Sequence, residues 1–343
     1  MSNRKFAFAM IDLVVAINIC VISFCCWLPN LNSSRESARR MQCSNNLKQI
    51  ALASLNHESA NIRYPSGGWT SEYVGDPDRG FGKGQPGSWA YSLLPYMEQN
   101  ALYQLGGDGG ASNISDRLKS GAALACQTPL TVFFCPSRRS PGLYTVSRDS
   151  YKNSNLITGG QAKSDYAANF GSTLMKNEAE NLDYSTSVSK IIIPKTPSGV
   201  IYDCSETRVG EIRDGMANTY LIGEKFVYTD KYETAGEGDQ ICAYAGLDGD
   251  VTNSNFRSAG DVTISVKYGE PALTGTAYLP RQDCVSTAPG SESAYLGFGG
   301  PHKKGFTMSM CDGSVQVIPY DIDAAVHACL SNRRDGAAAK IPD

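Results

Sequence analysis

The sequence predicts an α+β protein in which a long N-terminal transmembrane and spine helix precedes a mainly antiparallel, β-rich globular domain. Three observations predict this fold class. An apolar run over residues 6–28 continues into a helical pattern of apolar residues. Strand-like segments outnumber helical ones beyond residue 130, and turns rather than regularly alternating helices connect them. Among 343 residues there are 34 Gly and 18 Tyr with 41% hydrophobic residues, which is typical of a turn-rich globule.

Charge excludes one class of partner. Charged residues make up 19% of the chain and the net charge is -3. A protein that recruits nucleic acid through its overall field needs a basic surface, so we expect no nucleic-acid partner.

The segment over residues 6–28 has the length of a membrane span. A bilayer core of about 30 Å needs about 20 apolar residues, and Asp12 is the only charge in this run. Arg4 and Lys5 precede it, and no A-x-A cleavage site follows it, so we expect the helix to be retained. We predict a basic leader over 1–7, a transmembrane and spine helix over 8–60, and an extracytoplasmic domain over 61–343.

Helical spacing continues beyond the apolar run to about residue 57. If the whole stretch is helical it measures roughly 75 Å at 1.5 Å per residue, with a possible kink at Pro29. The apolar positions that we expect to face the globule are Ala38, Met41, Leu47, Ile50, Ala51 and Leu55.

Helices and then strands are predicted in the remainder. Ser88 is placed to cap a helix with a bend at Pro95, residues 106–110 break it, and residues 115–126 have helical character. Runs rich in β-branched and aromatic residues predict strands at 130–135, 190–194, 199–204, 219–228 and 262–268, with two more near the C-terminus.

The last two strands form a predicted hairpin. Phe306, Met308 and Met310 alternate on one side, and Asp312 with Gly313 suits a type I′ turn. His302, which precedes this hairpin, is interpreted as a hydrogen-bonded structural residue, the alternative being a metal ligand together with Asp312. With three His in the chain and no HExxH motif, we expect no catalytic zinc.

Oxygen-rich side chains gather in one further loop. Asp248, Asp250 and Asn253 could hold calcium, although the spacing lacks the central Gly and distant Glu of an EF-hand, and an ordinary turn is the alternative. The chain contains no nucleophile elbow and no Walker loop. The spacing GxGxxG occurs over residues 82–87, in a loop rich in Gly and Pro and not between a predicted strand and a helix. We therefore expect no enzyme activity and no cofactor.

The polar part of the chain contains an even set of eight cysteines. In an exported protein such a set predicts disulfides, but the spacing selects none of the 105 possible pairings. Complete pairing and a mixture of free buried thiols with one or two bridges are both open. The eight are Cys43, Cys126, Cys135, Cys204, Cys242, Cys284, Cys311 and Cys329.

Several segments resemble one known family. The spacing H-x9-DG from His302 to Asp312 and Gly313 is similar to the C-terminal segment of a planctomycete-type family of prepilin-like proteins of unknown function. Further segments resemble that family in the same order along the chain. They are 38–59, 88–104, 133–139 (FFCPSRR), 165–171 (DYAANFG), 211–224 (ending YLIGE) and 244–250.

The resemblance implies a pilin-like fold and a processed N-terminus. A prepilin peptidase would cut between Ala7 and Phe8, Phe8 would be methylated, and Asp12 would be the acidic fifth mature residue. The family pattern prefers Gly where Ala7 stands and Glu where Asp12 stands. The implied location is the cytoplasmic membrane, with a single pass and the N-terminus in the cytoplasm.

Two functions follow from these expectations. The first is a pseudopilin-like structural subunit, similar to those of type II secretion, that assembles through its N-terminal helix into a homo- or hetero-oligomer. The alternative is a membrane-tethered module that binds a glycan or solute, with Trp69, Tyr73, Trp89 and Tyr91 as candidates for stacking on sugars.

Overall fold

The computed structural model describes residues 10–171, 182–195, 197–236, 239–246, 262–265, 279–288 and 297–336, without the side chains of 11–12, 21–33 and 262–265. Several predicted sites fall outside these residues. They are the processing residues Ala7 and Phe8, the side chain of Asp12, and the calcium candidates Asp248, Asp250 and Asn253.

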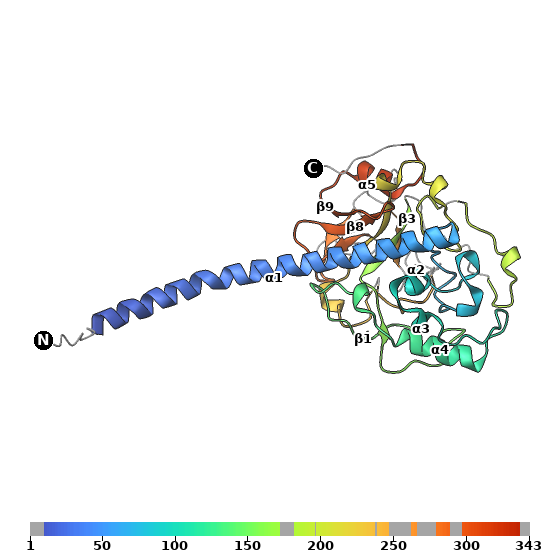
Figure 1. Ribbon diagram of the computed structural model, residues 1–343, viewed down its shortest axis with the longest axis horizontal. Coiled ribbons are helices and arrows are strands. Elements are labelled where there is room, and N and C mark those ends of the chain that lie inside the picture. The colour runs from blue at the N-terminus through green and yellow to red at the C-terminus, as the bar shows by residue number, and fades with distance from the viewer. Residues whose placement is uncertain are drawn as a thin grey trace, which may run out of the picture.

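One helix of 52 residues, α1 (Met10–Asn61), dominates the shape of the molecule. It continues without interruption through position 29, so the predicted extension of the helix is confirmed. At 1.5 Å per residue its length is about 78 Å. Its N-terminal part projects from the globule, while its C-terminal part lies along it (Figure 1). Within the described part of the chain, no helix has both the length and the apolar character that a membrane crossing requires.

The fully buried face of α1 begins at Cys43. Cys43, Leu47, Ile50 and Ala51 are fully buried at spacings of four, three and one residues, and they form one helical face. Met41, which the pattern placed on the same face, is 63% exposed because it lies on the outer face of α1 with Asn45 and Leu52. Residues 43–61 of α1 therefore belong to the same core as the globule.

A five-stranded sheet forms the centre of the globule. Its order is β5 (Val262–Ser265), β3 (Tyr166–Gly171), β4 (Tyr220–Glu224), β8 (Phe306–Met310) and β9 (Val315–Ile318). Only the β3–β5 pair is parallel, and the other three pairs are antiparallel. The predicted α+β class with a mainly antiparallel sheet is confirmed.

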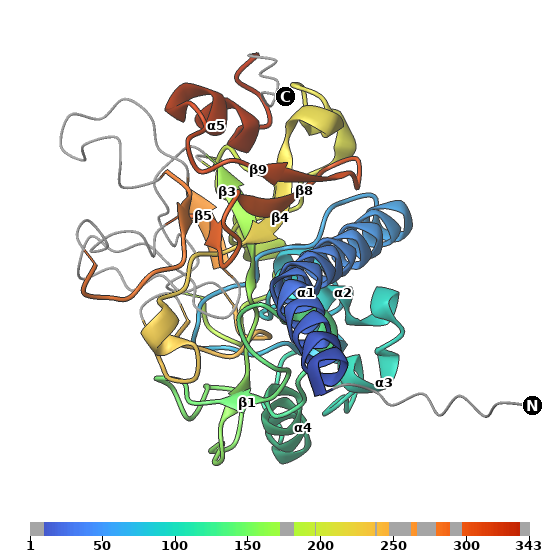
Figure 2. The same ribbon diagram turned by 90° about the vertical axis from the view of Figure 1, so that its left-hand side faces the viewer.

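Helices cover both faces of this sheet. Leu47 and Ile50 of α1 pack with Tyr166 and Ile222 in the larger core cluster. On the other face, Ala328 and Leu330 of α5 (Ala324–Ser331) pack with the apolar side chains of β8. Figure 2 shows α1 and α5 on opposite sides of the strands. Two short two-stranded sheets lie outside this centre: β1 (Leu143–Tyr144) with β2 (Gln161–Ala162), and β6 (Arg281–Gln282) with β7 (Gly299–Gly300).

The helices between α1 and the sheet follow their predicted signals. Ser88 caps α2 (Trp89–Leu93) by accepting the N–H of Tyr91. Pro95 lies in the first turn of a new 3₁₀ segment, which separates α2 from α3 (Asn100–Tyr103). Ser115 caps α4 (Asp116–Cys126) in the same way as Ser88, so both predicted helix starts are confirmed.

Three predicted strands are wrong. Residues 130–135 contain a 3₁₀ turn (Thr131–Phe133), and residues 190–194 and 199–204 are irregular. Side chains such as Phe133, Ile191 and Val200 fill the core from loops, whereas Ile192 is 80% exposed. Burial rather than strand pairing therefore explains most of the composition of these segments. Conversely, β3 was not predicted as a strand. Its sequence YAANFG is buried on both faces and shows no alternation.

The C-terminal hairpin is confirmed, but its turn differs from the predicted type. A type I′ turn needs a positive φ at both central residues. Among the described residues, Gly313 has φ +81° and Asp312 does not have a positive φ. The N–H of Gly313 instead donates to the carbonyl of Met310, and the N–H of Met310 donates to the carbonyl of Ser314. Gly313 is thus the left-handed residue of a three-residue loop.

His327 of α5 lies fully buried against the aromatic rings of Tyr220, Phe298 and Phe306. Burial lowers its pKa from 6.5 to about 3. The folded chain therefore keeps this ring neutral at pH values where the unfolded chain protonates it, so stability is present above pH 6.5 and falls as the pH falls. From pH 7 to pH 5 this group alone is expected to cost about 2 kcal/mol of unfolding free energy.

The measurement compares chemical unfolding of the detergent-solubilised full chain with that of a His327→Gln variant at pH 7, 6 and 5. The variant is expected to lose this part of the acid sensitivity. Tyr220→Phe is the control, because it removes the hydroxyl 3.1 Å from Nδ1 and leaves the imidazole in place. Parallel pH profiles for the wild-type and His327→Gln chains would contradict the prediction.

Candidate functional site

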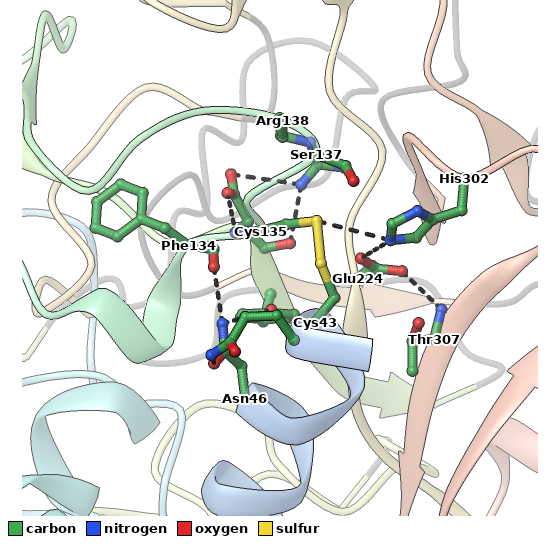
Figure 3. Close-up of a disulfide and its surroundings, with 12 residues drawn as sticks. Cys43, Asn46, Phe134, Cys135, Ser137, Arg138, Glu224, His302 and Thr307 are labelled. Atoms are coloured by element: carbon green, nitrogen blue, oxygen red, sulfur yellow. Dashed lines mark hydrogen bonds and ion pairs between the residues drawn. A yellow bond between two sulfur atoms is a disulfide. The ribbon is translucent and has the colours of Figure 1, made fainter. Parts of the chain in front are cut away.

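Four segments far apart in the sequence meet at one buried cluster, shown in Figure 3. Helix α1 contributes Cys43, the segment after the 3₁₀ turn Thr131–Phe133 contributes Cys135, β4 ends in Glu224, and the loop before β8 contributes His302. Cys43 and Cys135 form a disulfide across 92 residues, with their Cα atoms 5.3 Å apart. All four side chains are at most 2% exposed. We call this set the Cys–His–Glu cluster.

His302 stands between two carboxylates. Its Nδ1 lies 3.0 Å from Oε1 of Glu36 on α1, and its Nε2 lies 3.4 Å from Oε1 of Glu224. The same Nε2 lies 3.7 Å from the sulfur of Cys135. Burial lowers the pKa of His302, but Glu224 and Glu36 together outweigh burial and raise this pKa above its ordinary value. The ring thus connects α1, the disulfide and the sheet.

Backbone groups hold the cluster in place. Oε2 of Glu224 accepts the N–H of Thr307 at 2.7 Å, which ties the end of β4 to β8. The N–H of Cys135 donates to Asp165 at 2.8 Å, and Asn46 of α1 donates to the carbonyl of Phe134 at 2.9 Å. The other oxygen of Glu224, Oε1, accepts no hydrogen bond from the described residues. It faces Nε2 of His302 (Figure 3).

A network of buried charges continues from the Cys–His–Glu cluster. Arg138 contacts Asp165 and Asp283, and Arg139 contacts Asp165 and Asp239. Nζ of Lys163 lies 3.0 Å and Nζ of Lys225 lies 2.9 Å from Asp239. Because Arg139, Lys225 and Lys163 surround it, the pKa of Asp239 is well below its ordinary value despite burial. Burial lowers the pKa of Lys225 to about 8 against the opposing effect of Asp239. We call these residues the buried charge network.

The Cys–His–Glu cluster offers one ligand atom from each of four residues, and all three of its residue types bind transition metals. Two sulfurs, one imidazole nitrogen and one carboxylate oxygen all lie within 4.8 Å of one another. In the disulfide state the sulfurs are bonded to each other, so this set is complete only after reduction. No metal was expected here from the sequence, since the four residues are widely separated along the chain.

The structure separates the two parts of the H-x9-DG segment. His302 precedes β8 and belongs to the Cys–His–Glu cluster, whereas Asp312 and Gly313 form the turn at the other end of β8. Oδ1 of Asp312 accepts the N–H of Ser314 at 2.8 Å and its hydroxyl at 2.7 Å. The two residues are therefore not brought together as metal ligands. His302 is buried and lies 3.0 Å from Glu36, and its interpretation as a structural residue stays a prediction.

Sequence reasoning missed Glu36 and Glu224 and did not select Cys43 with Cys135. The resemblance to the family was an available signal for Cys43, Cys135 and Glu224. These three residues lie in the family-like segments 38–59, 133–139 and 211–224, and each joins His302 in the cluster. Among the two open alternatives for the cysteines, the mixture is confirmed within the described residues. One bridge accompanies free thiols at Cys126, Cys204, Cys242, Cys311, Cys284 and Cys329.

The aromatic residues proposed for stacking on sugars are core residues. Trp69, Tyr73, Trp89 and Tyr91 are at most 3% exposed, so their rings are not available to a ligand. A groove of about 590 Å³ lies elsewhere, between α1 and the segments 96–99 and 129–132. Its lining combines Leu52 and Met97 with amide side chains of Gln49 and Asn56.

Comparisons with known proteins give one match. A family model described as "Protein of unknown function (DUF1559)" matches residues 32–325. No curated protein and no solved structure matches the chain. The matched region begins within α1 before Glu36 and extends past His302 into α5, so it includes every residue of the Cys–His–Glu cluster.

Proposed function

The chain belongs to the family of proteins of unknown function DUF1559, and on that premise we propose that it is a membrane-anchored, prepilin-like structural protein. One observation carries the proposal: a single helix, α1, packs on the globule over its C-terminal part and projects from it over its N-terminal part (Figure 1). The exposed part presents apolar side chains. Leu13, Val14, Val15 and Ile17 are each more than half exposed.

Exposed apolar side chains on a helix are expected to be covered by lipid or by another helix. The apolar run over residues 6–28 gives the segment the composition of a membrane anchor. In this proposal α1 crosses the cytoplasmic membrane once with its N-terminus in the cytoplasm, and after release from the membrane it packs against the same helix of other subunits. Such assembly would make the protein similar to the pseudopilins of type II secretion.

The disulfide supports an extracytoplasmic location for the globule. Disulfides form and persist in oxidising compartments and are rare in the cytosol. Cys43 lies in the part of α1 that is buried against the globule, and Cys135 lies within the globule. The planctomycete-type prepilin resemblance of the leader, with Ala7, Phe8 and Asp12, supports processing by a prepilin peptidase.

Mass spectrometry of the N-terminus of the membrane-extracted protein tests the proposal. The mature chain is expected to begin at Phe8 with a methylated amine. Replacing Ala7 with Leu is expected to block processing, because the pattern requires a small residue there, whereas Ala7→Gly is expected to keep it. A mature protein that retains Met1 would contradict the processing. Assembly is tested by cross-linking, in membranes, chains that carry variants in α1. If these chains stay monomeric, the proposed assembly is contradicted.

The alternative proposal, a tethered binding module, has one supporting observation. The groove beside α1 combines apolar and amide side chains, as a small-molecule site does. This alternative predicts that a ligand changes the melting temperature of the full chain and that Asn56→Ala removes this change. Unchanged melting across a broad panel of glycans and solutes would contradict it.

A further inference from the structure

The Cys–His–Glu cluster has the donor atoms and spacing of a tetrahedral zinc site. In such a site the metal lies about 2.3 Å from sulfur and about 2.0 to 2.1 Å from nitrogen or oxygen. Tetrahedral angles then place nitrogen and sulfur about 3.6 Å apart, and nitrogen and oxygen about 3.3 Å apart. In the structure Nε2 of His302 lies 3.7 Å from the sulfur of Cys135 and 3.4 Å from Oε1 of Glu224. Two of the distances between ligand atoms that a tetrahedral site requires are therefore already present in the structure.

The orientation of the donor atoms also favours a cation. With the Nδ1 proton of His302 directed to Glu36, the lone pair on Nε2 points at a carboxylate oxygen and a sulfur atom. Three electron-rich atoms converge, and the carboxylate oxygen accepts no hydrogen bond within the described chain. A proton or a metal ion between these three atoms would offset their mutual repulsion and give the carboxylate oxygen a partner.

His302 and Glu224 each make a second hydrogen bond of the kind that orients the ligands of a metal site. A metal-bound histidine usually donates its other ring N–H to a carboxylate, and Glu36 occupies that position 3.0 Å from Nδ1. The second oxygen of Glu224 is held by the N–H of Thr307 at 2.7 Å. Thus His302 and Glu224 are fixed in the structure before any metal binds.

We propose that, when the Cys43–Cys135 disulfide is reduced, Cys43, Cys135, His302 and Glu224 bind one zinc-type divalent cation. The disulfide links α1 to the segment that contains Cys135, and the metal would link the same two segments and, through Glu224, the end of β4. A dithiol reductant would supply two electrons and two protons to break the S–S bond and would itself become a disulfide. Binding of Zn²⁺ then releases the two thiol protons. The sulfurs separate to about 3.8 Å, the distance across a tetrahedral dithiolate site.

The site is tested on the full chain in detergent, under anaerobic conditions. A phosphine reductant breaks the disulfide: water supplies two protons to the thiolates and its oxygen to the phosphine, which becomes a phosphine oxide. The chain is then freed of reductant and given Zn²⁺ or Co²⁺. The reduced protein is expected to hold about one more equivalent of metal than the oxidised protein. Co²⁺ is expected to give the intense visible bands of a tetrahedral site with a sulfur-to-metal charge-transfer band.

Variants assign the ligands. His302→Ala and Glu224→Gln are expected to lower the affinity of the reduced chain for zinc by at least about tenfold, and Glu36→Gln by about 10- to 100-fold through its contact with His302. Cys311→Ser and His327→Gln are the matched controls, since they alter a buried free thiol and a buried histidine elsewhere. Both controls are expected to bind zinc like the reduced wild-type chain.

A second measurement on the unmodified chain does not depend on the folding of variants. Zinc is expected to protect Cys43 and Cys135 from alkylation, as read by mass spectrometry, and to leave the alkylation of Cys284 and Cys329 unchanged. Equal metal content in the reduced and oxidised proteins would overturn the proposal. So would protection that falls on other cysteines. Neither result bears on the processing of the N-terminus. The zinc site and the proposed function are therefore tested independently.

Discussion

A chain that begins at residue 61 is expected to remain unfolded, whereas a chain that begins at residue 34 is expected to fold. The first lacks the buried face of α1, including Leu47 and Ile50, and it lacks Cys43. Burying each large aliphatic side chain contributes about 1.5–3 kcal/mol, and a disulfide typically contributes about 2–4 kcal/mol. Together these losses are comparable to the whole stability of a domain, about 5–15 kcal/mol.

Circular dichroism and thermal unfolding of the two purified chains provide the measurement. The chain from residue 34 keeps Glu36 and Cys43, so it is expected to melt cooperatively without detergent. A cooperative melting transition in the chain from residue 61 would contradict the prediction, because it would show that the globule folds without α1.

Replacing Asp239 with Asn is expected to lower the free energy of unfolding by about 3–5 kcal/mol, the usual cost of removing one partner from a buried ion pair. Asp239 is fully buried and contacts Arg139, Lys163 and Lys225. The amide of Asn carries no charge, so the substitution leaves the positive charges of the buried charge network in excess. Chemical unfolding of the full chain provides the measurement.

A second substitution separates loss of charge from loss of packing. Adding Lys225→Met to Asp239→Asn removes one of the excess cations and is expected to restore part of the stability. Asp116→Asn is the matched control, because the carboxylate of Asp116 is fully exposed and lies 3.7 Å from Lys119. That control is expected to change stability little. If Asp239→Asn and Asp116→Asn lowered the free energy of unfolding equally, the buried charge network would not have the stabilising role proposed for it.

The parts of the fold that sequence predicts well are those with a local signal. Helix starts at Ser88 and Ser115 depend on a side chain that accepts a backbone N–H three residues later, and both are observed. The C-terminal hairpin was predicted from alternation and from Asp312-Gly313, and only its turn type differs. The segments 130–135 and 190–194 were misassigned, since apolar residues in a buried loop have the same composition as those in a strand.

The candidate site was less predictable because it depends on long-range contacts. His302 was selected from the H-x9-DG spacing, but its partner Glu36 lies 266 residues earlier in the sequence. Glu224 lies in the family-like segment 211–224, but that segment contains two other acids, Glu211 and Asp214, and its sequence does not show which acid is buried. A buried carboxylate is recognised only when the strand pairing and the covering helix are known.

The separation between Glu36 and His302 also constrains the kinetics of folding. The hydroxyl of Tyr64 donates to the carbonyl of Cys311, another contact across 247 residues, and β4 pairs with the distant β8 as well as with β3. Such a high contact order predicts slow folding, because long loops must close before these contacts form. The contacts of α1 with β8 and with His302 can form only after the C-terminal hairpin has been synthesised. Until then the apolar face of α1 stays exposed, and it is during this interval that the protein is most prone to aggregate.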